Sequence, residues 1–191
     1  MTSPIRTSVL DAVSELLRTT PWGAVTMAGI AGVAGVSRQT VYNEFGSRQA
    51  LAQEYVLREV NRFLGEVEQA VLAHASDPHA AITAAFRVFL DTTADHPLVK
   101  SIERHDELFG LVTVNGEPVL HAATAFLTGL ILRTWPDVDP AAVGLLAESV
   151  TRLGISHVIL PSGPAELTAR AMAELMAPFI TLHTGIAPGG D

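Results

Sequence analysis

Apolar residues recur along the chain at the three- and four-residue spacing of an α-helix, and almost never at the two-residue spacing of a β-strand. Three such stripes are clear in the first half of the chain. They are formed by Val9, Val13, Leu16 and Leu17; by Tyr55, Val56, Phe63, Val67 and Val71; and by Ile82, Ala85, Phe86, Phe89 and Leu90. The pattern predicts an all-α protein.

Prolines mark several of the predicted helix starts, because the first turn of a helix needs no backbone N–H from its own residues. They are Pro78, Pro97, Pro118, Pro140 and Pro164. Together with the apolar spacing they predict about nine helices, over residues 5–19, 26–33, 37–43, 47–74, 78–94, 97–111, 118–134, 140–159 and 164–183. Pro178 lies inside the last helix and is expected to kink it or end it early. Residues 185–191 are predicted to form a flexible tail.

Residues 26–45 carry the signals of two short helices joined by a tight turn. Thr26 and Ser37 can each cap the start of a helix with a side-chain oxygen. Gly35 can adopt the left-handed conformation where the first helix ends. Val41 and Phe45 are expected to pack on the core. This arrangement predicts an N-terminal three-helix domain, residues 1–47, that contains a helix-turn-helix.

The outward face of the second short helix displays side chains that suit the major groove of DNA. Arg38 can bind guanine through two hydrogen bonds, whereas Gln39 and Asn43 can pair with adenine. Thr40 can contact a thymine methyl group or a phosphate. These residue types on one short helix therefore indicate sequence-specific DNA binding.

Phosphate contacts are predicted beside this face. Ser47 is expected to cap the next helix, whose free N–H groups can hold a phosphate with Arg48 alongside. Thr26 and Tyr42 are further candidate phosphate anchors. The complete predicted DNA-binding set is Thr26, Ser37, Arg38, Gln39, Thr40, Tyr42, Asn43, Ser47 and Arg48.

This segment resembles the helix-turn-helix of TetR-family transcriptional regulators. The family pattern is filled by Thr26, Ile30, Ala31, Ala34, Gly35, Val36, Ser37, Thr40, Val41, Tyr42 and Phe45. The likeness continues to Leu51, so about 50 of the 191 residues carry it. Glu44 departs from the pattern, because the family usually has a non-acidic residue there. Its carboxylate is expected to repel phosphate, to accept a bond from a cytosine amine, or simply to be solvated.

The resemblance implies a ligand-responsive transcriptional regulator, usually a repressor, that binds a pseudo-palindromic operator as a homodimer and is released by an inducer. It also implies that the last two helices of each chain form the dimer. Residues 140–183 agree, because they are rich in Ala, Gly, Leu and Val. The candidate dimer residues are Leu145, Leu146, Val150, Leu153, Gly154, Leu167, Ala171, Leu175 and Phe179.

Charge is divided unevenly along the chain, whose net charge is −8. Residues 1–50 carry four basic and three acidic groups, whereas residues 51–191 carry 8 basic and 17 acidic groups. A DNA-binding domain with so few cations needs a second copy, because affinity rests largely on neutralised phosphates. Residues 48–184, which carry most of the acidic groups, are predicted to form a larger helical domain for ligand binding and dimerisation.

Residues 78–134 contain more apolar side chains than one buried stripe requires, which predicts a cavity between helices. The resemblance implies a small-molecule pocket in the same region. Walls so poor in charge suit a lipophilic effector with one polar end, such as a fatty acid or its derivative. Arg152 is a candidate partner for that polar end, and an ion pair with Glu148 is its alternative role. The candidate ligand contacts are Phe86, Phe89, Ile102, His105, Phe109, His121, Phe126, Leu130 and Arg152.

Other classes of protein find less support. The chain has no cysteine and no known metal-binding, nucleophile-elbow or phosphate-loop motif, so we expect no enzyme, no metal and no cofactor. Two alternatives stay open: an enzyme using Glu103, His105 and Asp106, and a helical small-molecule binding protein without DNA activity. No apolar run reaches the roughly 20 residues that span a membrane, and no signal peptide is evident, which predicts a cytoplasmic protein without a membrane partner.

Overall fold

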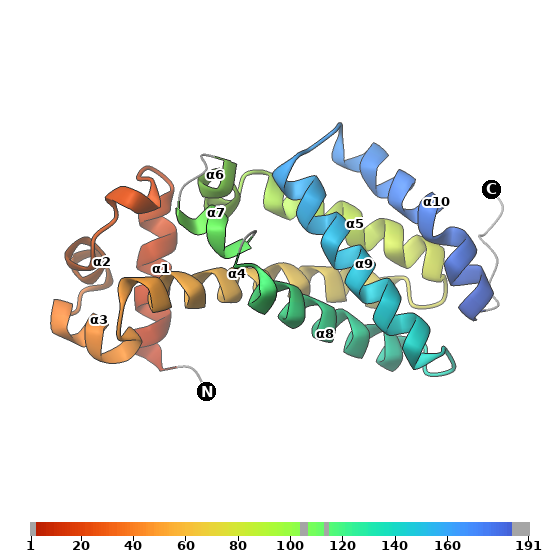
Figure 1. Cartoon of the computed structure of the whole chain (residues 1–191), viewed down its shortest axis with the longest axis horizontal. Coiled ribbons are helices and arrows are strands. Elements are labelled where there is room, and N and C mark those ends of the chain that lie inside the picture. The colour runs from red at the N-terminus through yellow and green to blue at the C-terminus, as the bar shows by residue number, and fades with distance from the viewer. Residues whose placement is uncertain (1–2, 104–106, 113–114, 185–191) are drawn as a thin grey trace. The chain divides into compact units, whose positions relative to one another are not determined.

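The structure is a computed structural model that describes residues 3–103, 107–112 and 115–184. These ranges contain helices and connecting segments and no strand, which confirms the predicted all-α fold (Figure 1). The elements are α1 (Pro4–Leu17), the 3-10 helix η1 (Trp22–Ala24), α2 (Met27–Ala34), α3 (Arg38–Phe45), α4 (Arg48–Ala73), α5 (Pro78–Ala94), α6 (Pro97–Glu103), α7 (Glu107–Val112), α8 (Glu117–Thr134), α9 (Pro140–Ile159) and α10 (Ala165–Thr184).

Two predicted helices agree with the structure at both ends. These are α5 and α9, each of which begins with a proline and follows an aspartate that accepts bonds from backbone N–H groups of the first turn. Over the predicted helix 97–111 the structure has α6 and α7, and residues 104–106 lie outside the described part. The predicted tail, residues 185–191, lies outside it as well.

Of the two effects predicted for Pro178, an early end of the last helix is wrong, and a kink stays a prediction. Helix α10 continues through Pro178 to Thr184. A proline in a helix deprives the carbonyl group four residues earlier of its N–H donor, which here is the carbonyl of Glu174. Both residues are exposed, so water can replace the missing donor.

The residues group into two compact units. The first contains residues 1–59 and 96–119, and therefore includes α1, η1, α2, α3, the start of α4, and both α6 and α7. The second contains residues 60–95 and 120–191, and includes α5, α9, α10 and most of α8. The predicted boundary between residues 47 and 48 lies twelve residues before this division and stays a prediction.

In the first unit, α1 supplies much of the core. Val9, Val13 and Leu17 are fully buried, and α1 contacts both α2 and α6. Trp22 of η1 is also buried, with 1% of its surface exposed. Burial of an aliphatic side chain such as Val13 or Leu17 stabilises the folded state by roughly 1.5–3 kcal/mol. The two short helices of the helix-turn-helix therefore rest on a core that α1 and η1 help to build.

A buried carboxylate joins α4 to the residue before α6. Glu59 is only 1% exposed, and its Oε2 lies 3.1 Å from Nε2 of His96. Nδ1 of His96 accepts a bond from the backbone N–H of Leu98 at 3.2 Å, so Nε2 carries the proton and donates to Glu59. Burial by itself would raise the pKa of Glu59, but hydrogen bonds from His96 and Arg58 outweigh it and lower that pKa.

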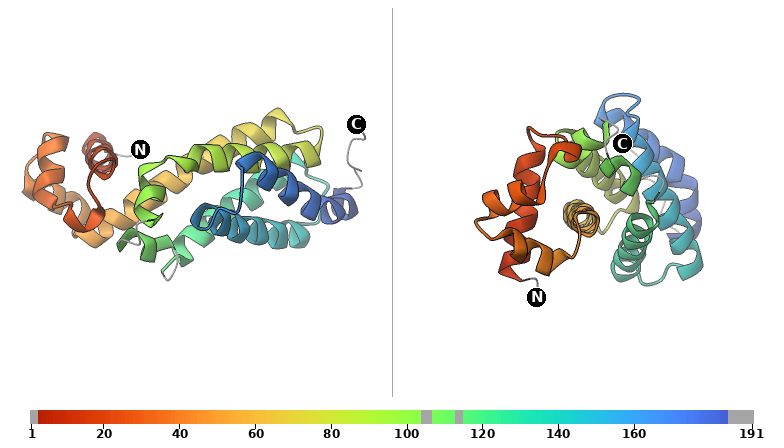
Figure 2. Two further views of the ribbon diagram at one scale, coloured as in Figure 1. Left: turned by 90° about the horizontal axis from the view of Figure 1, so that it is seen from above. Right: turned by 60° about the vertical axis from the view of Figure 1, so that its left-hand side comes forward.

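In the second unit, α5 packs against both α9 and α10 (Figure 2). One core cluster contains Val67, Val71, Ala81, Ala85 and Leu130, with Phe89, Phe126, Leu127 and Trp135 packed on it. A second contains Phe86, Ala169 and Met172, with Ile82, Val150 and Leu153 packed on it. Gly154 of α9 lies so close to Phe89 that a Cβ atom there would be 3.3 Å from the ring. A small residue at position 154 thus permits close packing of α9 on α5.

Replacement Glu59→Gln is expected to lower the free energy of unfolding near pH 7 by about 2 kcal/mol, because hydrogen bonds to a buried charge are lost. The folded pKa of Glu59 lies below the unfolded value of about 4.3, so the ionised group stabilises the protein above that value. Its contribution is lost as the pH falls through the folded pKa. Urea denaturation at several pH values should therefore show the two proteins converging in acid.

The matched control is Glu15→Gln, at an exposed position of α1. It is expected to change the free energy of unfolding by less than about 0.5 kcal/mol. A difference between wild type and Glu59→Gln that does not vary with pH would contradict the assignment of Glu59 as the ionised member of this pair.

Candidate nucleic-acid interface

Side-chain caps and a left-handed glycine fix the two short helices of the helix-turn-helix. The Thr26 hydroxyl accepts a bond from the backbone N–H of Gly29 at 3.1 Å, and the Ser37 hydroxyl accepts one from Thr40 at 3.0 Å. Gly35 ends α2 with φ at +68°, a conformation that strongly favours glycine. The capping roles predicted for Thr26, Gly35 and Ser37 are confirmed.

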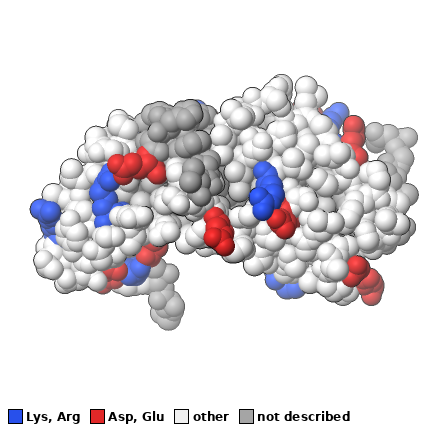
Figure 3. All heavy atoms as spheres, viewed as in Figure 1, with Lys and Arg blue, Asp and Glu red and all other residues white. Residues whose placement is uncertain are grey.

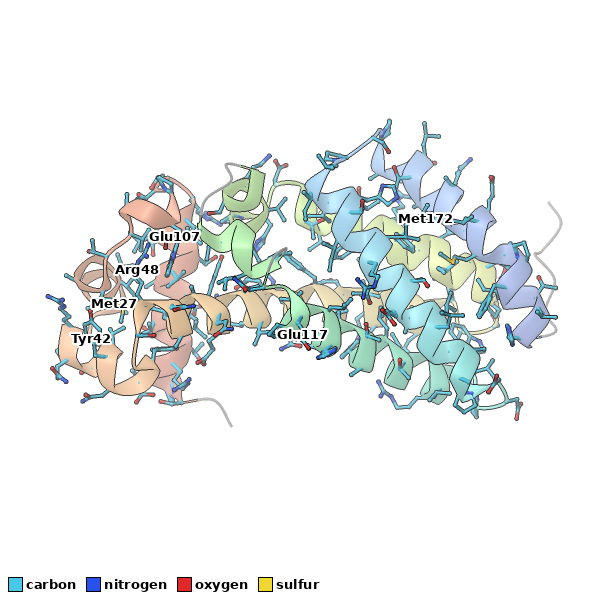
Figure 4. The ribbon with its side chains drawn as sticks, in the orientation of Figure 1. Met27, Tyr42, Arg48, Glu107, Glu117 and Met172 are labelled. Carbon is cyan, nitrogen blue, oxygen red and sulfur yellow. The ribbon has the colours of Figure 1, made fainter. Side chains whose placement is uncertain are left out.

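Helix α3 has one buried and one exposed face, as its residue spacing predicts. Val41 is fully buried and Phe45 is 6% exposed. The opposite face carries four exposed side chains and two half-buried ones. The exposed residues are Ser37, Arg38, Gln39 and Asn43, and the half-buried ones are Thr40 and Tyr42. Figure 4 marks Tyr42 on this helix. The structure therefore brings these predicted DNA-binding residues together on one exposed face.

The exposed side chains of α3 contact one another. Nε2 of Gln39 donates to Oδ1 of Asn43 at 2.9 Å, one helical turn away. The guanidinium of Arg38 lies 5.5 Å from the ring centre of Tyr42, within range of a cation–π contact. Figure 3 shows that charged side chains are few and scattered on the face it draws. The exposed face of α3 thus presents amide hydrogen-bonding groups and the cation of Arg38.

Ser47 and Arg48, the two predicted phosphate contacts at the start of α4, differ in their surroundings. The exposed Ser47 accepts a bond from the backbone N–H of Ala50 at 3.1 Å, which confirms its role as a cap. The guanidinium of Arg48 donates to the carbonyl groups of Trp22 and Val25 and pairs with a carboxylate of α7. These contacts assign the Arg48 donors to protein partners and give no support to the predicted phosphate contact.

Glu44, the residue that departs from the TetR pattern, has a partner within the protein. Its carboxylate lies 3.5 Å from Nη1 of Arg6, and the same nitrogen donates to the Glu44 carbonyl oxygen at 2.6 Å. Arg6 also pairs with Glu54 and lies 4.6 Å from the ring centre of Phe45. Glu44 is therefore not simply solvated but joins α3 to α1, whereas its predicted phosphate repulsion or cytosine contact stays a prediction. Sequence reasoning missed Arg6 because its partners are 38 and 48 residues away.

Comparison with known proteins gives the same interpretation over the whole chain. Residues 9–55 match the description of bacterial regulatory proteins of the tetR family, and residues 77–178 match the bacterial tetracyclin repressor C-terminal domain. The chain belongs to the TetR family. One relative, the HTH-type transcriptional regulator AlkX of Mycobacterium tuberculosis, is 36% identical over 182 residues, which is 94% of this chain and 86% of that protein.

Solved TetR-family structures share the fold. The crystal structure of the TetR-family repressor AlkX from Dietzia sp. is 32% identical, with a TM-score of 0.84, and covers 95% of this chain and 97% of that one. A TetR-family regulator from Streptomyces coelicolor has 17% identity and a TM-score of 0.66, covers 95% of this chain and 83% of that one, and supports the fold alone.

These findings confirm the predicted class of function: a DNA-binding transcriptional regulator of a family whose members are typically ligand-responsive repressors. The family and these relatives are transcriptional regulators and not enzymes.

Four apolar candidates for the TetR-family effector site lie in the core of the second unit. Leu130 is 1% exposed, and Phe89 and Phe126 pack on its cluster. Phe86 is 3% exposed and belongs to the neighbouring cluster with Ala169. The structure therefore brings Phe89, Phe126 and Leu130 together. The side chains of Ile102 and Phe109, and the whole of His105, lie outside the described part, as does the alternative enzyme site formed by Glu103, His105 and Asp106.

The polar ligand candidates lie on the surface of this single chain. His121 and Arg152 are both exposed. Arg152 donates to Glu148 at 2.8 Å on the same helix, which is the ion pair given above as its alternative role. In the described ranges, no group of three His, Asp or Glu side chains is arranged to hold a metal ion.

One helix among the described residues is long and apolar enough to cross a membrane by length and composition alone. It is α9 (Pro140–Ile159), of which the test stretch is 28% buried. A single helix of this kind is weak evidence for a membrane span, because helices that pack within soluble proteins pass the same test.

Proposed function

We propose that this protein binds a pseudo-palindromic DNA operator in the cytoplasm as a homodimer, represses transcription there, and is released by a small lipophilic effector. The observation that carries the proposal is the exposed polar face of α3, on which Arg38, Gln39 and Asn43 stand together. The first turns of a recognition helix enter the major groove in helix-turn-helix proteins. Those three side chains are the ones that suit base edges.

The remaining polar groups of the helix-turn-helix would position the protein on the phosphates. Thr26 and Ser47 are exposed at the starts of α2 and α4, where the backbone N–H groups of a helix favour anions. Ser37, Thr40 and Tyr42 flank the base-reading face and can contact the sugar–phosphate backbone. Neutral hydrogen bonds of this kind orient the protein without adding much charge-dependent affinity.

The proposed dimer uses residues 140–183. Five leucines there are strongly exposed in the single chain, and three of them are predicted dimer residues: Leu145 is 60%, Leu167 is 62% and Leu175 is 60% exposed. By contrast, Val150 and Leu153 pack on the core of their own chain. Exposed apolar side chains on α9 and α10, which both pack on α5, indicate a surface that another protein covers. Two copies related by a two-fold axis would present recognition helices about 34–36 Å apart, or a multiple of that spacing.

The proposed effector is a long-chain, alkane-derived molecule such as a fatty acid. The AlkX repressor from Dietzia sp., 32% identical to this chain, is described as implicated in biodegradation of n-alkanes. The core of the second unit offers aromatic and aliphatic side chains, among them Phe86, Phe89 and Leu130, that suit a hydrocarbon chain. His121 and Arg152 are the proposed partners for its polar end.

Selection of bound duplexes from a random DNA pool tests the main proposal. We expect enrichment of a site with two related halves. Within that site, Arg38→Ala should weaken binding by about 1–3 kcal/mol, and the loss should depend on the base that Arg38 reads. The measurement is the dissociation constant by fluorescence anisotropy for the selected duplex and for duplexes with single base changes.

Arg18→Ala is the matched control, because Arg18 is an exposed cation of the same unit that lies after α1. It should weaken binding to every duplex by the same amount, and this loss should be smaller than the loss caused by Arg38→Ala. An equal loss on all duplexes for Arg38→Ala would mean that Arg38 holds a phosphate and not a base.

Leu175→Glu is expected to weaken the homodimer by about tenfold or more, because the interface would then bury an unpaired charge. Sedimentation equilibrium measures the effect. Leu72→Glu, at an exposed leucine of α4 outside residues 140–183, is the control and should leave the dimer intact. A Leu175→Glu protein as dimeric as wild type would move the interface to another surface.

Long-chain fatty acids are expected to raise the melting temperature by several degrees at concentrations far above their dissociation constant, since a ligand that binds only the folded state stabilises it. Differential scanning fluorimetry with acids of increasing chain length measures this, and butyrate is the control for the carboxylate alone. If no lipophilic compound changes the melting temperature, the effector assignment is wrong.

A further inference from the structure

Arg48, at the first position of α4, donates a hydrogen bond from each of its three guanidinium nitrogens to a partner within the first unit. Nε donates to the carbonyl oxygen of Val25 at 3.2 Å, and Nη2 donates to the carbonyl oxygen of Trp22. The guanidinium also lies 4.5 Å from the ring centre of Trp22. Nη1 donates to Oε2 of Glu107 at 2.7 Å. We call these four residues, Arg48, Trp22, Val25 and Glu107, the Arg48 cluster; Figure 4 labels Arg48 and Glu107.

The two carbonyl groups in the Arg48 cluster belong to the backbone that leads directly into α2. Trp22 begins η1, and Val25 immediately precedes Thr26, the capping residue of α2. The Trp22 side chain is buried, so its position is fixed by the core. A guanidinium that binds both carbonyls restricts the path of residues 22–25 and therefore the place at which α2 starts. Thr26, a proposed phosphate contact, is the next residue.

Glu107 completes the cluster from α7, 59 residues further along the chain. It is the first residue of α7, and α7 contacts η1 as well. Its side chain is 63% exposed, whereas that of Arg48 is 30% exposed. An ion pair so open to water contributes little to global stability. Its effect is instead to orient the guanidinium, since a carboxylate on one side leaves the other donors directed at the two carbonyls.

We propose that Glu107 is a positioning residue for DNA binding: through Arg48 it holds residues 22–25, and thereby Thr26 and the start of α2, in the arrangement that the DNA backbone requires. This inference rests on the DNA-binding function proposed above. It also reverses a simple electrostatic expectation, because removing a negative charge from a DNA-binding unit should strengthen binding to a polyanion.

The sign of the effect of Glu107→Gln therefore tests the proposal. We expect this variant to bind the duplex selected by the wild-type protein about twofold to fivefold more weakly. Glu15→Gln removes the same charge from an exposed position of α1 in the same unit, and it should bind as tightly as wild type or more tightly. Stronger binding by Glu107→Gln, or equal behaviour of the two variants, would overturn the proposal.

Arg48→Lys separates positioning from a direct phosphate contact. Lysine keeps the positive charge, but it cannot bridge two carbonyl groups and a carboxylate at once. If Arg48 positions the backbone, Arg48→Lys weakens binding and leaves the dependence of affinity on salt unchanged, because the number of neutralised phosphates is the same. Wild-type affinity in Arg48→Lys would mean that the positive charge alone is needed, which would assign Arg48 to a phosphate and overturn the proposal.

Hydrogen–deuterium exchange of the free protein gives a readout that does not need DNA. Glu107→Gln should speed exchange in residues 22–29 and leave α9 unchanged. Unchanged exchange in residues 22–29 would refute the positioning role even if DNA binding were affected. Conversely, a wild-type protein that selects no duplex would refute the proposed function itself, so the two failures are distinguishable.

Discussion

The DNA-binding face depends on two helices that are too short to be stable alone. Helices α2 and α3 contain eight residues each, whereas isolated helices of fewer than about 12–15 residues are marginal in water. Local caps satisfy their first N–H groups, and the buried side of each packs on the core of the first unit. Beyond that, two arginines from outside the pair bind backbone carbonyls at its two ends. Arg6 binds the carbonyl of Glu44 near the end of α3, and Arg48 binds two carbonyls just before α2.

This use of arginine explains why residues 1–50 have few cations left for DNA. Of the four arginines in residues 1–50, Arg6 and Arg48 each pair with a carboxylate of the protein. Their guanidinium groups are planar forks that can bind several oxygens at once, which suits them to fix backbone geometry. The same assignment removes two charges from the electrostatic attraction to phosphate. In the DNA complex that we propose, affinity then depends more heavily on base contacts and on joining two copies.

Sequence reasoning succeeded where the relevant signal is local. The caps Thr26 and Ser37, the left-handed Gly35 and the two faces of α3 follow from residue type and three- to four-residue spacing.

Reasoning failed where partners are distant along the chain, because no spacing rule connects Arg6 with Glu44 or Arg48 with Glu107. It also could not divide the apolar residues of α9 and α10 between core and exposed surface. Two leucines illustrate the difficulty, since they are the same residue type and differ only in their neighbours: Leu153 packs inward, whereas Leu175 is exposed.

The hydrogen bond between Gln39 and Asn43 has a consequence for discrimination among DNA sequences. In the free protein the Gln39 amide donates a hydrogen bond to the Asn43 amide, so each side chain already has one partner without a base. Contact with an adenine edge must replace or share that bond, and a sequence with the wrong donors and acceptors offers nothing in exchange. For the base-reading role that we propose for these amides, the closed pair would therefore disfavour strong trapping on unrelated duplex, because only matching bases would compensate for the exchange.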